Sequence, residues 1–266
     1  MKNGFAIFLA ALLVLGSSWS AFVLAPQLQF GGAKQVAILN SSDVYPLQRT
    51  GDAALGLQVY RANGCAACHT MQMQQDMAVC DVVLLNAGKK PEAVTNLMAG
   101  LKLEGLTEKA ADAVSGQISA AGGKVETHIV PVGADIARGW GARHSVAEDF
   151  LYDYPVQLGS LRAGPDLANV GARLPDANWQ LIHLYAPQSL MKGSLMPSFR
   201  YLFATRKIGN APSPDALRLP KELAPAPDYE VVPKPEAKQL VAYLLSLNAN
   251  VPLYDAPYTP PATPKP

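Results

Sequence analysis

The chain has 266 residues, of which 49% are hydrophobic, and its formal net charge at pH 7 is +1. This length allows one globular domain with additional segments, and the nearly neutral charge gives no support for nucleic-acid binding. The chain contains 22 prolines, and those near its end predict an extended, Pro-rich tail over residues 251–266.

The first segment determines the compartment. Residues 4–25 contain no charged side chain, and as a helix they would span about 33 Å, close to the ~30 Å hydrocarbon thickness of a bilayer. We therefore predict a retained transmembrane anchor over residues 1–26, with Lys2 on the cytoplasmic side. The alternative is a cleaved signal peptide with its apolar region at residues 5–15. Both interpretations place the rest of the chain outside the cytoplasm.

Residues 65–69 read Cys-Ala-Ala-Cys-His, the C-x-x-C-H signature for covalent attachment of a c-type haem. Each thiol can form a thioether with a haem vinyl group, and His69 then becomes the proximal iron ligand. A closed zinc site fits less well, because the remaining cysteine and histidines lack its paired spacing. A dithiol redox motif needs a βαβ context, whereas residues 52–63 predict one short helix. We therefore predict an electron carrier with one haem held by Cys65, Cys68 and His69.

A hexacoordinate electron-transfer haem needs a second axial ligand, which is commonly methionine because a thioether stabilises ferrous iron. The methionines that closely follow His69 are too near to reach the opposite haem face, and Met98 fits the core face of a helix. Met191 and Met196 remain as candidates. We prefer Met196, because it precedes Pro197 in a loop that can hold a side chain against the iron.

Residues 71–138 are predicted to form an inserted α+β segment. Its predicted elements are, in order, a strand at 82–85, helices at 91–100 and 107–121, and a second strand at 124–130. This β-α-α-β unit is large enough to pack a small core of its own. Cys80 has no cysteine partner if the other two hold haem, and we expect it to be a buried free thiol.

Two further sequences, Tyr-Asp-Tyr-Pro at 152–155 and Gly-Pro-Asp-Leu at 164–167, are more specific than the haem motif. With them, the chain resembles the membrane-anchored mono-haem cytochrome c subunit, subunit II, of cbb(3)-type cytochrome c oxidases. The likeness keeps order and spacing over about residues 1–70 and 139–203, and stops in the insert. The segments that carry it are the N-terminal span and residues 60–69, 144–155, 159–167, 170–171, 179, 183–184, 187 and 194–197.

The resemblance implies an electron-transfer subunit of a respiratory haem-copper oxidase. Such a subunit takes electrons from a donor cytochrome c and passes them to the catalytic subunit, where oxygen is reduced, so this chain would not itself be catalytic. The implied partners are the catalytic and other oxidase subunits, the donor cytochrome and the lipid bilayer. The implied location is the bacterial inner membrane, with the haem domain on the periplasmic side. The alternative function is a free-standing, membrane-tethered shuttle cytochrome c.

The resemblance also assigns roles to individual residues. It makes His69 and Met196 the axial ligands, in agreement with the motif and the loop. It implies that the carbonyl of Pro165 accepts the free N–H of His69. Arg162 and Arg173 become candidate partners of the haem propionates, because a fork of donors suits a carboxylate, although either could be an ordinary surface charge.

The implied fold is mainly α, a cytochrome c-type haem domain on a single N-terminal transmembrane helix with a small α+β insert. Gly56 and Tyr60 on the first helix of the haem domain would then meet Tyr243 on a terminal helix at 236–248. We expect His183, in a helix-like run, to be a hydrogen-bonded packing residue. The predicted segments are the anchor (1–26), the linker and first part of the haem domain (27–70), the insert (71–138), the remainder of the haem domain (139–250) and the tail (251–266).

Overall fold

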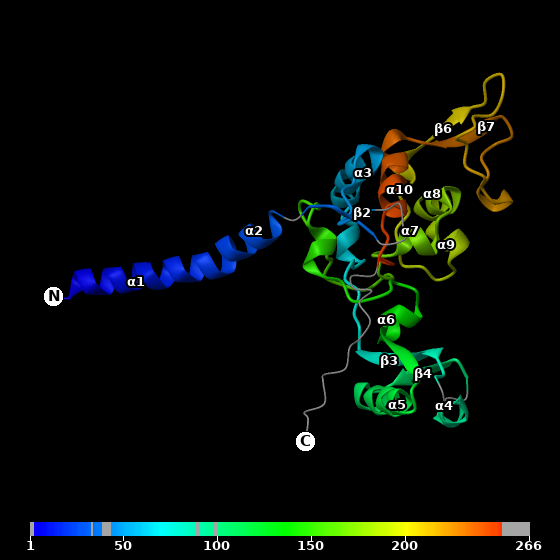
Figure 1. The fold of residues 1–266 in the computed structure, drawn as a ribbon. Helices are drawn as coiled ribbons and strands as arrows, with labels where there is room; N and C mark the ends of the chain where they lie inside the picture. The colour runs from blue at the N-terminus through cyan, green and yellow to red at the C-terminus, as the bar shows by residue number, and fades with distance from the viewer. Residues whose placement is uncertain (1–2, 33, 39–43, 89–90, 98–99, 252–266) are drawn as a thin grey trace. The chain divides into compact units, whose positions relative to one another are not determined.

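A computed structural model of the chain describes residues 3–251, apart from 33, 39–43, 89–90 and 98–99. The tail predicted for residues 251–266 therefore lies outside the described residues, except for Val251. Contacts divide the chain into two compact units. One contains Met1–Gln48 and Val146–Val156, and the other contains Arg49–Ser145 and Gln157–Pro266 (Figure 1).

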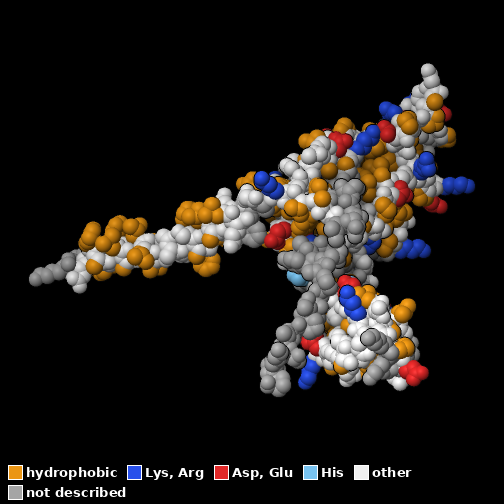
Figure 2. All heavy atoms as spheres, in the orientation of Figure 1, with side chains coloured by type: hydrophobic (Ala, Val, Ile, Leu, Met, Phe, Trp, Pro, Cys, Tyr) orange, Lys and Arg blue, Asp and Glu red, His pale blue; other side chains and the backbone are white. Residues whose placement is uncertain are grey.

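The first unit consists mainly of a long N-terminal helix. It is built from α1 (Gly4–Trp19), a π-helical turn (Ser20–Leu24) and α2 (Ala25–Phe30). Its part from Gly4 to Gln29 is long and apolar enough to cross a membrane, and Figure 2 shows exposed hydrophobic side chains along it. Pro26 lies just after the π-helical turn, within the long helix.

The rest of the first unit follows this helix. Its elements are the two-residue strands β1 (Val36–Ala37) and β2 (Val44–Tyr45), which pair antiparallel, and a 3₁₀ turn at Ala147–Phe150. The hydroxyl of Tyr45 donates to the carboxylate of Asp149 at 2.9 Å. This bond joins the segment after the long helix to residues about a hundred positions later.

The second unit is organised around two crossing helices, α3 (Gly51–Ala62) and α10 (Pro235–Leu245). Gly56 permits the crossing, because a Cβ there would lie 1.9 Å from the carbonyl oxygen of Gln239. The rings of Tyr60 and Tyr243 meet beside it, with centroids 5.4 Å apart. The crossing implied by the family resemblance is therefore confirmed.

Shorter elements surround this helix pair. Helices α7 (Val170–Arg173) and α8 (Ala177–Tyr185) pack against α10, and α9 (Pro187–Leu190) follows α8. Strands β6 (Phe203–Lys207) and β7 (Tyr229–Pro233) form an antiparallel pair, which the sequence reasoning did not predict.

The insert contains one more strand than predicted. Its elements are β3 (Met77–Asn86), α4 (Pro91–Leu97), β4 (Lys102–Leu106), α5 (Glu108–Ala120) and β5 (Lys124–Val132), with strand order β4-β3-β5 and antiparallel pairing throughout. The predicted β-α-α-β order is therefore wrong. Strand β4, Lys-Leu-Glu-Gly-Leu, has a glycine and two charges and weak intrinsic strand preference. It becomes a strand at the edge of the sheet through its pairing with β3.

The insert has its own core on one face of the sheet. The buried side chains are Cys80, Val82, Val94, Ala111 and Ile118. Cys80 is a buried free thiol, as expected, and burial raises its pKa, as do nearby carboxylates. The chain enters and leaves the insert at one place, because the N–H of Asp76 donates to the carbonyl of Val132 at 3.0 Å.

The described residues thus combine one N-terminal candidate transmembrane helix with further helices and some sheet. The predicted fold class is confirmed in this coarser form. The prediction that the fold is mainly α is not clearly confirmed, because strands make up a substantial part of the described residues. The predicted boundaries between segments stay a prediction.

Candidate haem site

The haem motif begins where α3 ends. Gly64 adopts a left-handed backbone conformation, with φ of 65°, and lets the chain turn sharply into the 3₁₀ turn Cys65–Ala67. The N–H of His69 closes this turn by donating to the carbonyl of Cys65 at 3.0 Å. Both cysteines are free, with Cys65 half-buried and Cys68 exposed. Burial raises the pKa of the Cys65 thiol to about 11.

The ring of His69 is oriented by the loop at residues 164–166. Its Nδ1 lies 2.8 Å from the carbonyl oxygen of Pro165, which is the contact that the resemblance implies. A Cβ on Gly164 would lie 2.3 Å from Cε1 of His69, so the backbone of this glycine packs directly on the ring. With Nδ1–H donated to the carbonyl, the lone pair of Nε2 is left for a metal.

Asp166 fastens this loop to the haem motif, and sequence reasoning missed it. Its side chain is fully buried, at 0% exposure. It accepts hydrogen bonds from the hydroxyl of Thr70 at 2.6 Å, and from the backbone N–H groups of Gln72 at 2.9 Å and Ala168 at 2.8 Å. The only signal in the sequence was its position directly after Pro165.

The guanidinium of Arg162 donates all its hydrogen bonds to acceptors within the protein. Its Nε donates to the hydroxyl of Thr70 at 2.9 Å, and its Nη1 and Nη2 contact the buried carboxylate of Asp135 at 3.0 and 2.9 Å. Its Nη2 also donates to the carbonyl of Gln72. These contacts do not favour its predicted role toward a haem propionate, which stays a prediction. The contacts of Arg162 instead give it a structural role. It joins the residues after His69 to α6 (Ala134–Ala137), which follows β5.

Three buried polar atoms in this region have no hydrogen-bond partner among the described residues: Nε of Arg173, Nδ1 of His183 and the hydroxyl of Tyr60. Burial lowers the pKa of Arg173 and of His183, and raises that of Tyr60. Residues of the haem motif or its loop also affect these pKa values. Asp166 raises the pKa of Arg173, His69 lowers that of His183, and Cys65 raises that of Tyr60.

These atoms test whether the site fits a haem. Arg173 donates through Nη2 to the carbonyl of Asp166 at 3.2 Å and leaves Nε unpaired. Buried donors of this kind are costly unless an acceptor joins them, and a carboxylate is the natural partner of a guanidinium. The residues therefore fit a group that brings carboxylates next to His69, as a haem does. The expectation that His183 is fully hydrogen-bonded is not met at Nδ1.

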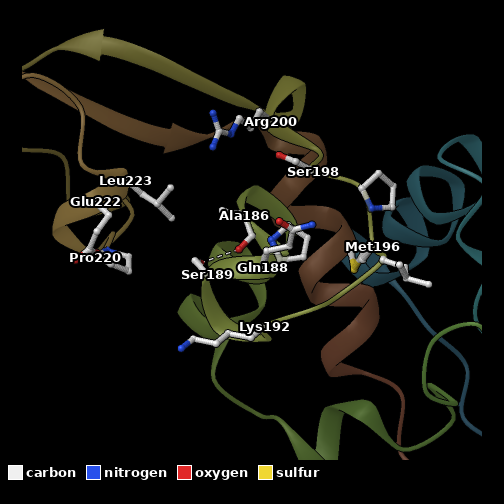
Figure 3. Close-up of a pocket in the computed structure, with 13 residues that line it drawn as sticks. Ala186, Gln188, Ser189, Lys192, Met196, Ser198, Arg200, Pro220, Glu222 and Leu223 are labelled. Atoms are coloured by element: carbon white, nitrogen blue, oxygen red, sulfur yellow. Dashed lines mark hydrogen bonds between the residues drawn. The ribbon is translucent and has the colours of Figure 1, made fainter.

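Met196 lies in a loop between α9 and a 3₁₀ turn at Arg200–Leu202. The side chain is half-buried, whereas Met191 is 54% exposed. Met196 also lines a groove of about 880 Å³, together with residues of α9, other residues of this loop and Pro220, Glu222 and Leu223 (Figure 3). The lower exposure favours Met196 over Met191, and the choice of axial ligand stays a prediction.

The site thus has features typical of a c-type cytochrome: two neighbouring free thiols, an oriented histidine and buried donors near it. Residues 126–223 match the family described as cytochrome c oxidase, mono-heme subunit/FixO. The matched part includes Pro165, Arg173 and Met196, but not residues 65–69. Together with the one N-terminal apolar helix, it confirms the resemblance to a membrane-anchored mono-haem oxidase subunit. The family implies a haem c cofactor and oxidase partner subunits. A comparison with curated proteins finds no match.

Proposed function

We propose that this chain is the electron-transfer subunit of a cbb(3)-type cytochrome c oxidase in the bacterial inner membrane, with its haem domain on the periplasmic side. It accepts electrons from a donor cytochrome c and delivers them to the haem-copper catalytic subunit, where oxygen is reduced. The observation that carries the proposal is the geometry of His69, whose Nδ1 is held by Pro165 beside the two free thiols of the motif.

Each residue of the site has a distinct task in this proposal. Cys65 and Cys68 attach the cofactor, and His69 binds the iron through Nε2. The hydrogen bond to Pro165 fixes the imidazole ring and increases its basicity. When bound, the haem supplies reversible one-electron transfer at its iron. Met196 provides a soft thioether as the second ligand, which favours the ferrous state.

Arg173 is the better candidate of the two arginines for a haem propionate. Its Nε is buried and unpaired among the described residues, whereas every nitrogen of Arg162 contacts a protein acceptor. A carboxylate beside Arg173 would satisfy this donor. It would also compensate a partly buried positive charge, which is unfavourable alone.

The experiment is purification from membranes in a mild detergent, followed by identification of the proteins that accompany the haem-stained band. The expected result is covalent haem on this chain in a complex with a much larger haem-copper subunit. A Cys68→Ala variant is the control and should lose normal covalent attachment. A haem-bearing monomer that never associates with an oxidase would contradict the proposal and favour the shuttle cytochrome.

A further inference from the structure

His183 is a partly buried histidine whose Nδ1 atom is buried without a hydrogen-bond partner among the described residues. It lies on α8, and its ring stacks on Trp179 with centroids 4.8 Å apart and planes at 10°. This stacking fixes the plane of the imidazole and therefore the direction of its N–H bond. A histidine that only filled the core would be expected to satisfy Nδ1.

The position of His183 relates it to the haem motif. Burial lowers the pKa of His183, and the proximity of His69 acts in the same direction. A neutral imidazole carries one N–H donor. Arg173, on the preceding helix, also has a buried nitrogen without a partner. Two residues near the motif thus offer hydrogen-bond donors, an imidazole and a guanidinium. A carboxylate can accept a hydrogen bond from either group. A haem has two carboxylates, its propionates.

We infer that His183 donates a hydrogen bond from Nδ1 to a haem propionate, with Trp179 holding the ring in position. This inference rests on the proposed function, because it needs a haem in the site. Loss of the donor leaves the negative charge of the propionate less compensated. Since a negative charge near the iron stabilises the ferric state, loss of the donor lowers the midpoint potential.

Two variants separate this role from simple packing. His183→Gln keeps a side-chain N–H donor, whereas His183→Phe keeps an aromatic ring that can stack on Trp179 but has no donor. Redox titration of the full chain in detergent is expected to place His183→Gln within a twofold change of the ferrous/ferric ratio from wild type. His183→Phe is expected to lower that ratio severalfold at a fixed potential, where tenfold corresponds to 59 mV. The reverse order would show that His183 only packs and would overturn the inference.

A matched control is His128→Phe, which changes an exposed histidine on β5 and should leave the potential unchanged. Loss of the methionine–iron spectrum in His183→Phe would overturn the inference, because His183 would then act on the iron. Wild-type protein without covalent haem would overturn the proposed function as well. Covalent haem with an unchanged potential in His183→Phe would overturn this inference alone.

A measurement on the wild-type protein does not depend on how the variants fold. In the reduced, diamagnetic protein with ¹⁵N-labelled histidine, proton NMR should show a slowly exchanging proton on Nδ1 of His183. This proton should give a nuclear Overhauser effect to the propionate methylene protons. A rapidly exchanging proton, or no proton on Nδ1, would contradict the hydrogen bond.

Discussion

A single carbonyl oxygen decides which nitrogen of His69 is available to a metal. With Nδ1–H donated to Pro165, the lone pair of Nε2 is left for a metal. Asp166 then keeps this loop in place through three hydrogen bonds from Thr70, Gln72 and Ala168. The ligand is therefore oriented by the fold, which reduces the reorganisation that accompanies electron transfer.

The first prediction concerns the second axial ligand. Met196→Leu is expected to abolish the weak near-infrared band of methionine–iron bonding in the ferric protein and to lower the potential, because a leucine cannot stabilise ferrous iron. The measurement is absorption spectroscopy of the purified chain with a redox titration. Met191→Leu, in the same loop, is the control and should keep the band. The opposite pattern would assign the ligand to Met191.

The second prediction concerns Asp166. Asp166→Asn replaces one acceptor oxygen by an NH₂ group that faces the same three donors, so at least one hydrogen bond is lost at a fully buried site. We expect a loss of about 1–3 kcal/mol in the free energy of unfolding, measured by urea denaturation. Asp176→Asn, at the exposed N-cap of α8, is the comparison. Its effect should be smaller, because an asparagine can also cap a helix.

At the scale of elements, the crossing of α3 and α10 depends on a glycine. Gly56→Ala places a Cβ against the backbone of Gln239, which cannot move without separating the helices. We expect destabilisation by about 1–3 kcal/mol, as in other overpacked cores. Gly116→Ala is the matched control, because Gly116 lies in α5 with nothing within 4 Å of its added Cβ. That change should be neutral or stabilising, since alanine favours a helix.

The fourth prediction is that the insert folds as its own unit and is not needed for haem attachment. Replacing residues 77–131 by a short Gly/Ser linker should preserve covalent haem and its spectrum, because Asp76 and Val132, which both remain, are already hydrogen-bonded to each other. A deletion that extends through Asp135 is the comparison. It should reduce haem incorporation, because Asp135 binds Arg162 and the N–H of Gln74. Loss of haem in both deletions would contradict the prediction.

The sequence predicted those elements whose cause is local. A charge-free run predicts the long helix, and the C-x-x-C-H motif predicts which cysteines and which histidine would hold a haem. The crossing at Gly56 came from the family resemblance. Strand β4 could not be predicted, because its conformation depends on pairing with β3. The roles of Asp135 and Asp166 also depend on contacts between residues far apart in sequence, and the unpaired Nδ1 of His183 is visible only once its surroundings are known.

At the scale of the whole molecule, the N-terminal helix is the feature that determines location. The hydrophobic side chains of this helix are exposed along its length. Their contact with water would be unfavourable, and the helix is long and apolar enough to lie in a bilayer instead. Mature protein is expected to retain this helix and to stay in the membrane fraction after alkaline carbonate treatment. Sequencing of the mature N-terminus is the second measurement. A terminus near Ala21 would show that the segment is a cleaved signal peptide.

The hydrogen-bonded junction at Asp76 and Val132 has a practical consequence. Any compact domain whose own ends lie close together can be grafted between these two residues without changing the path of the chain around His69. The position therefore offers a place for a fluorescent reporter or an affinity handle, next to the haem-bearing fold but outside its helices. Such a graft would make a subunit of a membrane complex traceable during its assembly.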